Sequence, residues 1–349
     1  MPVPHGAGQA GAAGGSAVKC PEKEKMLLLT RFACRARSLS RRLPAPAVTR
    51  ALLALAVLAG ASPSLRAQTF RDGLMMNKGS FCTGFVYAHD SWDQYWEGSL
   101  KRDNQNIGTL TTQSVAWMGN YGITDRLNVI AVVPYVWTEA SQGVLHGMDG
   151  FQDITFGLKY KLLDTPFTGV GKLRTMLVAY AGTPLSDYTP DFLPMSIGSA
   201  STRTTGRLTL DFIANNGLFV TGNGGYTWRG EVTLDRPSYY TNGTLYFSDK
   251  VAMPDVFDYT VSVGYRKRGL QTPVSFSQQI TRGGGDIRRQ DMPFVSNKMN
   301  FKRIDALVEY YLPPAKRLAI QLGAGYVLDG RNVGQATQFT AGFLYVFNF

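Results

Sequence analysis

The sequence contains very little cysteine and histidine. Among 349 residues there are 3 Cys and 3 His, and Cys20 and Cys34 lie near the N-terminus, which leaves Cys82 for the rest of the chain. A disulfide framework or a thiolate metal site needs several cysteines at regular spacing. No two histidines have the His-x-x-x-His spacing of a metal site either. We therefore expect no cofactor and no metal site.

Long apolar runs are also missing. The most apolar stretch, residues 51–61, has 11 residues, whereas a membrane-spanning helix needs about 20. Arg41, Arg42 and Arg50 precede this stretch, and a small-residue site that ends at Ala67 follows it. This is the order of a secretory signal. A buried core helix is the alternative, but it does not account for the flanking residues, and we expect cleavage after Ala67.

Residues 1–67 are therefore expected to be a leader, made of a Gly/Ala-rich disordered extension and the signal peptide, with translation starting at Met1 or Met26. The leader holds ten Lys/Arg and two Asp/Glu, which is +8 of the formal +11. The remaining 282 residues carry 26 basic and 23 acidic side chains. The basic pI of the whole chain thus gives no reason to expect a nucleic-acid partner.

The rest of the chain shows no long helical period, but it has many segments of alternating apolar and polar residues. In residues 152–163, Phe156 and Tyr160 share one face, whereas Lys159 and Lys161 share the other. A period of two is typical of strands with one apolar and one polar face. The pattern predicts about twelve strands, with a margin of two, at residues 80–89, 106–118, 127–138, 152–163, 173–183, 204–214, 218–229, 256–266, 274–282, 301–311, 318–328 and 338–349.

Short and long connections alternate along these strands. Residues 121–126 and 313–316 are short turns, whereas residues 184–203 and 230–255 are long and polar. A transmembrane barrel has short periplasmic turns and longer extracellular loops, and only helices and closed barrels satisfy every backbone group in lipid. The sequence therefore predicts an all-β fold, an antiparallel transmembrane β-barrel over residues 80–349 in the bacterial outer membrane.

The last strand has an aromatic face. A barrel must present an apolar surface to lipid, and aromatic rings favour the two membrane–water interfaces, so outer-membrane lipid is the expected partner of this face. The terminal Phe349 resembles the closing residue of outer-membrane proteins and is expected to bind the barrel-insertion machinery. The two expected aromatic girdles are Tyr160, Tyr265, Tyr310, Phe347 and Phe349 near the periplasm, and Tyr135, Trp137, Tyr180, Tyr226 and Tyr326 near the outside.

The opposite strand faces carry charges of both signs. Two interpretations stay open: the charges hold neighbouring strands rigid, or they form a polar path for a small-molecule solute. Twelve strands enclose a lumen between that of a filled small barrel and that of a wide porin. Residues 68–79 either fold into this lumen as a plug or remain in the periplasm. The candidates for lining the lumen are Lys159, Lys161, Arg207, Asp211, Asp258, Arg266, Arg303, Asp305 and Glu309.

An aromatic segment follows the first expected strand. Trp92, Tyr95 and Trp96 are candidates for stacking on a sugar or a partner, or for collapsing into the barrel mouth. Hydrolase chemistry would need a serine beside a histidine and an orienting residue. His89 and Ser91 are two positions apart in the sequence, which is weak support, and we expect no enzyme activity.

Two stretches go beyond the general class. "YGITDRL" at residues 121–127 leads into Pro134-Tyr135, and residues 150–160 read "GFQDITFGLKY". These motifs resemble the outer-membrane family named for the meta-pathway of phenol degradation, and a weaker resemblance extends to the C-terminal strand. The resemblance implies a barrel that passes aromatic or other hydrophobic compounds, without catalytic residues.

The expected function is passive transport of small, hydrophobic or aromatic solutes through the barrel. The alternative is a structural or surface-interaction barrel that transports nothing, and a hydrolase is the least favoured interpretation. The sequence contains nothing that identifies the solute.

Overall fold

The structure is a computed structural model that describes residues 69–349, apart from residue 242, residues 289–292 and residues 314–316. The expected leader and its cleavage after Ala67 lie outside the described residues. Among the residues that are described, no helix is long and apolar enough to cross a membrane. The helical content there is η1, a short 3-10 helix at Pro190–Phe192.

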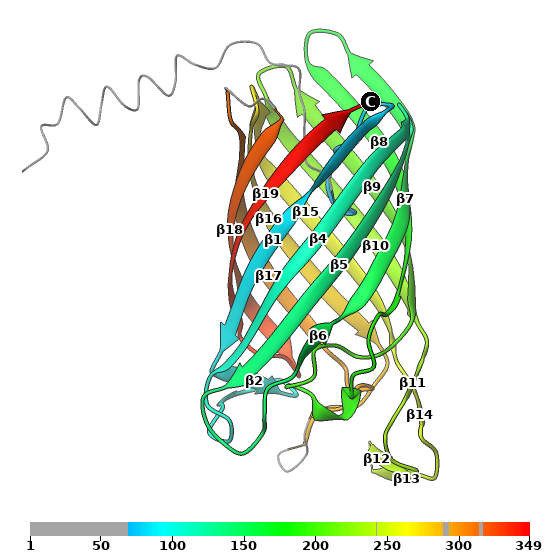
Figure 1. The fold of residues 1–349 in the computed structure, drawn as a ribbon, viewed down its shortest axis with the longest axis vertical. Helices are drawn as coiled ribbons and strands as arrows, with labels where there is room; N and C mark the ends of the chain where they lie inside the picture. The colour runs from blue at the N-terminus through cyan, green and yellow to red at the C-terminus, as the bar shows by residue number, and fades with distance from the viewer. Residues whose placement is uncertain (1–68, 242, 289–292, 314–316) are drawn as a thin grey trace, which may run out of the picture. The chain divides into compact units, whose positions relative to one another are not determined.

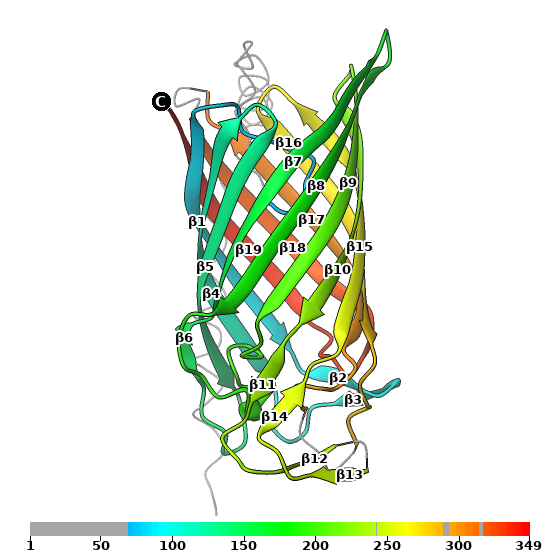
Figure 2. The same ribbon diagram turned by 90° about the vertical axis from the view of Figure 1, so that its right-hand side faces the viewer.

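Twelve long strands in this part of the chain form a closed antiparallel barrel (Figure 1). Each long strand pairs with the next one along the chain, and β1 also pairs with β19, which closes the ring. Figure 2 shows how the strands tilt around the barrel. The twelve are β1 (Ser80–Trp92), β4 (Leu110–Thr124), β5 (Leu127–Ala140), β7 (Asp153–Phe167), β8 (Gly171–Pro184), β9 (Arg203–Ala214), β10 (Leu218–Arg229), β15 (Asp255–Lys267), β16 (Leu270–Arg282), β17 (Asn300–Tyr311), β18 (Leu318–Arg331) and β19 (Thr337–Asn348).

Short strands decorate the longer connections. They lie at the end of the barrel away from the C-terminus (Figure 1), which is the outer end in the expected orientation. The short strands are β2 (Gln94–Glu97), β3 (Leu100–Asp103), β6 (Asp149–Phe151), β11 (Glu231–Thr233), β12 (Tyr239–Thr241), β13 (Thr244–Tyr246) and β14 (Lys250–Ala252).

All twelve expected barrel strands are present, but three of the short turns are tighter than expected. Residues 164–167 extend β7, so that residues 168–170 alone connect it to β8. Residues 121–124 extend β4, so that Asp125 and Arg126 alone connect it to β5. The turn before β16 consists of Arg268 and Gly269, whose φ angles are 55° and 80°. Two-residue hairpins prefer this positive-φ twist. The expectation of longer turns is wrong because cross-strand pairing continues through residues that resemble a turn in the sequence.

Exposure of the side chains follows the expected alternation on β7. Phe156, Leu158 and Tyr160 are exposed, whereas Thr155 and Lys159 are buried. Since successive side chains of a strand point to opposite faces, the apolar set faces outward and the polar set faces the lumen. An apolar outer surface matches lipid, which offers no hydrogen-bond partners.

The closing pair of strands shows the same division. Phe343 on β19 is 51% exposed, whereas its neighbour Leu344 is 0% exposed. Phe343 lies directly opposite Phe85 of β1, with ring centroids 5.9 Å apart, and Phe81 lies opposite Phe347. Such cross-strand aromatic pairs stabilise a sheet. The aromatic face of the last strand therefore lies outside the barrel and supports the seam that closes it.

Tyr180 does not belong to the outer aromatic girdle, and that expectation is wrong. It lies opposite Gly157, on the inward face of β7, and its ring centroid is 4.6 Å from that of Phe70. The alternation of β8 is weak because Met176 and Val178, which point inward, are as apolar as the outward residues. Residue type alone could not assign the two faces of this strand.

The two faces of β18 give a first test. Leu322 is 60% exposed, whereas Gln321 points inward. We expect Leu322→Arg to lower the free energy of unfolding in lipid vesicles by about 2–4 kcal/mol, because a cation then faces the hydrocarbon. Gln321→Arg is the matched control and should cost less, measured by denaturant unfolding in the same vesicles. Equal tolerance of both arginines would contradict the assigned faces.

Candidate functional site

The inward strand faces of the barrel are polar and mostly buried. Every lumen-lining candidate lies on the side of its strand opposite to the exposed apolar residues. A buried charge is costly unless it has partners, so their partners decide what the interior does. The buried candidates are Lys159, Arg207, Asp211, Asp258, Arg266 and Glu309, and the partly buried ones are Lys161, Arg303 and Asp305.

Arg207 on β9 binds Asp258 on β15 across the intervening strand β10. Its Nη2 lies 2.7 Å from each carboxylate oxygen, and its Nη1 donates to the side-chain oxygen of Asn223 at 2.5 Å. A Cβ atom at Gly225 would lie 3.0 Å from the guanidinium, so glycine provides the room. Charge-assisted contacts of this kind are strong and directional, and this one ties three strands together.

Arg266 on β15 makes a second contact across β10, with Asp211 on β9. Its Nη1 lies 3.0 Å from both oxygens of Asp211, and its Nε donates to Gln271 at 2.9 Å. The Thr221 hydroxyl donates to Asp211 at 2.6 Å. The guanidinium also lies 4.0 Å from the ring centroid of Phe219, a cation–π distance. Asp211 and Arg266 are thus fully engaged with neighbouring groups.

Residues 69–76, which precede β1, lie inside the barrel (Figure 2). Lys159 Nζ donates to the Thr69 carbonyl and to Asp72 Oδ1, both at 2.8 Å, and no part of the lysine side chain is exposed. Asn223 donates to the Arg71 carbonyl at 2.9 Å. The segment therefore occupies the space between the inward faces of β7 and β10.

The segment also fits the wall by shape. A Cβ atom at Gly73 would overlap the carboxyl group of Asp211, so glycine allows the backbone to approach that buried acid. Leu74 and Met76 are buried, and Met76 packs in a cluster with Cys82 and Leu344. Ionic contacts and apolar packing together hold residues 69–76 against the lumen wall.

The remaining candidates lie apart from this group. Arg303 Nε donates to Asp305 at 2.6 Å, and its Nη2 donates to Gln338 at 2.6 Å. Lys161 pairs with Asp164 at 3.3 Å near the periplasmic end. Glu309 lies opposite Gln271 in the β16–β17 ladder, beside the Arg266 contact. The candidates thus divide into one central network and two smaller pairs.

At the outer end, the loop of residues 185–202 is anchored to the barrel mouth. Tyr188 donates to Asp153 Oδ1 at 2.5 Å, and Arg203 Nη1 donates to Asp153 Oδ2 at 2.7 Å. Burial, and then the bond to Asp153, raise the pKa of Tyr188. The Tyr188 oxygen also accepts from the Ala200 backbone N–H at 3.0 Å. Both ends of the loop are therefore fixed to one buried carboxylate.

Asn332 joins three outer loops. Its φ angle is 56°, a conformation that asparagine tolerates better than most residues. Its side-chain oxygen accepts from the backbone N–H groups of Gly98 and Ile287 at 2.8 and 3.1 Å. Its nitrogen donates to Asp286 at 2.8 Å and to the Lys298 carbonyl at 2.7 Å. All four hydrogen bonds that the amide offers are formed.

The loop aromatics are packed against the barrel rim. Trp96 is 6% exposed and lies on Gly330, and Trp92 lies on Gly334. Tyr95 forms a β-bridge with Gly334, and its ring centroid is 6.2 Å from that of Trp92. The two tryptophans therefore contribute to loop packing, and Tyr95 remains beside a cleft.

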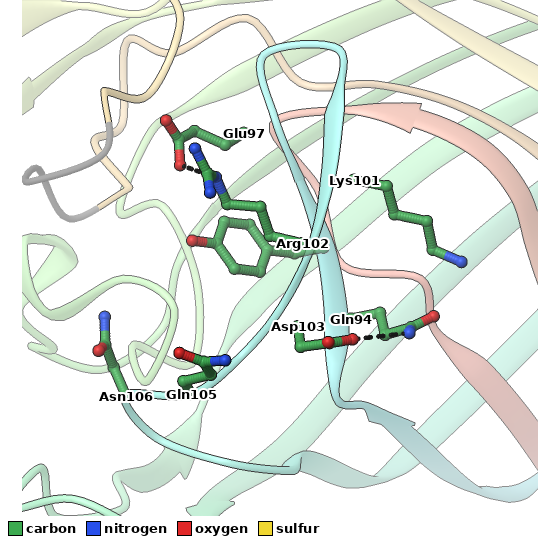
Figure 3. A pocket seen from close by; sticks show the side chains of 8 residues that line it. Gln94, Glu97, Lys101, Arg102, Asp103, Gln105 and Asn106 are labelled. Carbon is green, nitrogen blue, oxygen red and sulfur yellow. Dashed lines mark hydrogen bonds and ion pairs between the residues drawn. The ribbon is translucent and has the colours of Figure 1, made fainter.

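That cleft is a polar cavity of about 500 Å³ in the β2–β3 hairpin (Figure 3). Three of its four charged groups already have partners, because Arg102 Nε lies 2.6 Å from Glu97, and Asp103 accepts from Gln94 at 2.8 Å. Its charges of opposite sign balance, so its lining carries no net charge. The lining residues are Gln94, Tyr95, Glu97, Lys101, Arg102, Asp103, Gln105 and Asn106.

The residues considered for hydrolysis lie on the outward face of β1. His89 lies opposite Phe339, and Ser91 lies opposite Thr337, on the parity of the lipid-facing Phe85 and Phe343. No group of three or more His, Cys, Asp or Glu residues in the described part of the chain could hold a metal ion.

Comparison with known proteins agrees with the geometry. A family model described as "Putative MetA-pathway of phenol degradation" matches residues 105–343. The chain belongs to this family. No curated protein shows a significant match to the chain.

Solved structures add the fold. An outer membrane channel from Pseudomonas putida F1 superposes with a TM-score of 0.64 at 13% identity, covering 81% of this chain and 100% of that one. The NanC porin superposes with a TM-score of 0.38 at 8% identity, covering 74% of this chain and 98% of the porin. The translocator domain of NalP from Neisseria meningitidis superposes with a TM-score of 0.39 at 9% identity, covering 87% of this chain and 96% of that domain. Of these three, only the channel is similar enough to support an argument, and its likeness shows that the protein has the fold of an outer-membrane β-barrel.

Sequence reasoning missed several residues that organise the interior. Asp153 and Arg203 stand at expected strand ends, and Asn332 stands in a loop, where polar side chains are ordinary. Their partners are more than 30 residues away in the sequence, so no local pattern signals them. The sequence did contain a signal for Asp72 and Gly73. An acidic residue and a glycine lie beside apolar Leu74, directly before the first barrel strand, and this mixture suits a segment that packs against a polar wall.

The buried pair Arg207–Asp258 gives a second test. Its side chains are 0% and 10% exposed. We expect Asp258→Asn to destabilise the folded barrel by about 3–5 kcal/mol, because the substitution leaves a buried guanidinium without its anion. Asp329→Asn is the matched control in the exposed Lys302–Asp329 pair, whose side chains are 46% and 56% exposed, and it should cost about 0–1 kcal/mol. Denaturant unfolding in vesicles measures both, and similar costs would contradict the burial of the first pair.

The contacts of Asp286 with Arg331 and Asn332 at the outer end give a third test. The hydrogen bond from Arg331, helped by Asn332, lowers the pKa of Asp286 from 3.8 to about 2. A lowered pKa means that the contribution of this carboxylate is complete above pH 3.8 and is lost as the pH falls toward 2. We expect a carboxyl NMR titration of Asp286 to have its midpoint near the lower value. Asn332→Ala should raise that midpoint. A midpoint close to 3.8 in the unaltered protein would contradict the hydrogen bonds from Arg331 and Asn332 to Asp286.

Proposed function

We propose that the protein is a passive outer-membrane channel for small solutes, hydrophobic and aromatic ones included, and that residues 69–76 constrict its lumen. The observation that carries the proposal is the contact of this segment with the lumen-facing charges, above all Lys159 with Asp72 and Thr69. A barrel that served structure alone would need neither a polar interior of this extent nor an internal segment bound to it.

The family and the fold support a channel. The family description refers to phenol degradation, which fits aromatic solutes. The superposed channel has the same fold. The charged interior favours solutes that keep some polar character during passage, because the charges of the wall already bind one another and present a hydrogen-bonding surface.

The surface-interaction alternative rests on Tyr95 and the polar cleft of the β2–β3 hairpin. Trp96 contributes nothing to it while buried against Gly330. A barrel of this second kind would leave membrane permeability unchanged, so a transport experiment separates the two functions.

The test reconstitutes residues 68–349 in planar bilayers and compares the unaltered chain with Asp72→Asn and Gly73→Val. We expect measurable conductance in the unaltered chain and a higher conductance in both variants. The first variant removes the ion pair to Lys159, and the second places a side chain against Asp211. Asp329→Asn, on the exposed surface, is the control and should change nothing.

Two failures of this experiment have different meanings. If neither ions nor phenol cross membranes that contain the folded protein or its variants, the channel function is wrong. If the unaltered chain conducts and neither variant has a higher conductance than the unaltered chain, residues 69–76 do not constrict the path, although the channel function stands.

A further inference from the structure

Most inward-facing cations of the described barrel strands form ion pairs or side-chain hydrogen bonds, whereas Arg229 forms neither. Lys159, Arg207 and Arg266 are bound as described above. The guanidinium of Arg229 forms no ion pair and donates no hydrogen bond to any residue that the structure describes, although its backbone N–H donates to Asp255 Oδ1 at 3.0 Å. Arg229 follows the buried, inward-facing Thr227 on β10 by two positions, so its side chain is directed to the barrel mouth.

A second arginine stands directly opposite. The β9–β10 ladder pairs Arg229 with Arg203 across the strands. Like charges in such a cross-strand pair repel each other and destabilise the sheet. Arg203 is partly compensated by Asp153 at 2.7 Å and by the Thr155 hydroxyl at 3.2 Å, whereas Arg229 has no comparable contact. The pair of arginines therefore carries an excess of positive charge, which an anion would offset.

The surrounding charges define that anion. Three arginines here face two carboxylates: Asp153 binds Arg203, and Asp255 lies opposite Arg282 and also attracts Arg229. One positive charge is therefore left over. A single positive charge matches a singly charged ligand better than a doubly charged phosphate. Guanidinium groups bind carboxylates through two parallel hydrogen bonds.

We propose that Arg203 and Arg229 form a recognition site for the carboxylate of a small organic monoanion at the outer mouth of the barrel. The proposal rests on the channel function and names a class of solute for it. β9 begins and β10 ends at the outer end of the barrel (Figure 2), so the site meets a solute before the lumen network does. The solute then leaves these two arginines and moves inward by forming hydrogen bonds with the polar side chains of the lumen wall.

The experiment uses sodium benzoate as the probe and chloride current through the reconstituted channel as the readout. We expect benzoate added on the outer side to interrupt the current in a concentration-dependent manner. Arg229→Gln should abolish the interruptions, and Arg229→Lys should retain part of them, because the charge remains but the two-pronged geometry is lost. Neutral benzyl alcohol should not interrupt the current of any of these proteins.

Lys302→Gln is the matched control. It also removes one positive charge from a strand end at the outer side, but Lys302 is exposed and pairs with Asp329, away from Arg203 and Arg229. We expect its benzoate response to equal that of the unaltered protein. Denaturant unfolding of Arg229→Gln in vesicles shows that a lost response does not come from a lost fold, and Arg203→Lys is the second variant if Arg229→Gln does not fold.

The outcomes separate this site from the channel function. A conducting protein that ignores benzoate, or one in which Arg229→Gln and Lys302→Gln respond alike, overturns the proposed site and leaves the channel intact. Stronger interruption by phosphate than by benzoate also overturns it. If no variant conducts, calorimetric titration of the detergent-solubilised protein with benzoate decides: binding that Arg229→Gln removes supports the site, and absence of binding refutes it.

Discussion

The structure depends on one constraint, which is that lipid offers no hydrogen-bond partner to a peptide group. A sheet in that environment cannot keep an edge, so the first and last strands must pair. β1 and β19 do so from Ser80 to Ser91, and the aromatic pairs Phe85–Phe343 and Phe81–Phe347 support the seam on its lipid side. Closure then gives every strand an outward face that contacts lipid and an inward face that lines the lumen.

The inward face carries the consequences for function. Its charged side chains reach across an intervening strand and bind one another, as Arg207 binds Asp258 and Arg266 binds Asp211. Residues 69–76 enter the same network through Asp72. The charges thus join neighbouring strands and also attach residues 69–76 to the wall. The outer loops add a mouth that Asp153 and Asn332 hold in shape.

Much of the fold is readable from the sequence because lipid imposes a simple rule on alternate residues. The pattern of Phe156, Leu158 and Tyr160 against Lys159 is enough to assign the two faces of β7. The rule fails where both faces are apolar, as in β8, and the expectation for Tyr180 is wrong for that reason. It also fails for contacts that depend on closure: Lys159 and Asp72 are 87 positions apart in the chain, and Asn332 meets Gly98 across 234. Closure of the barrel brings such partners together, so no pattern of neighbouring residues in the sequence predicts them.

The most direct test of the closed barrel is the environment of single spin labels placed in turn at residues 153–163 of β7. Labels at Phe156, Leu158 and Tyr160 should collide readily with oxygen dissolved in lipid, whereas labels at Thr155, Gly157 and Lys159 should be shielded from it, which gives a period of two. A profile without that period, or one in which the lysine position is the lipid-exposed one, would contradict a closed barrel with an apolar exterior and a charged interior.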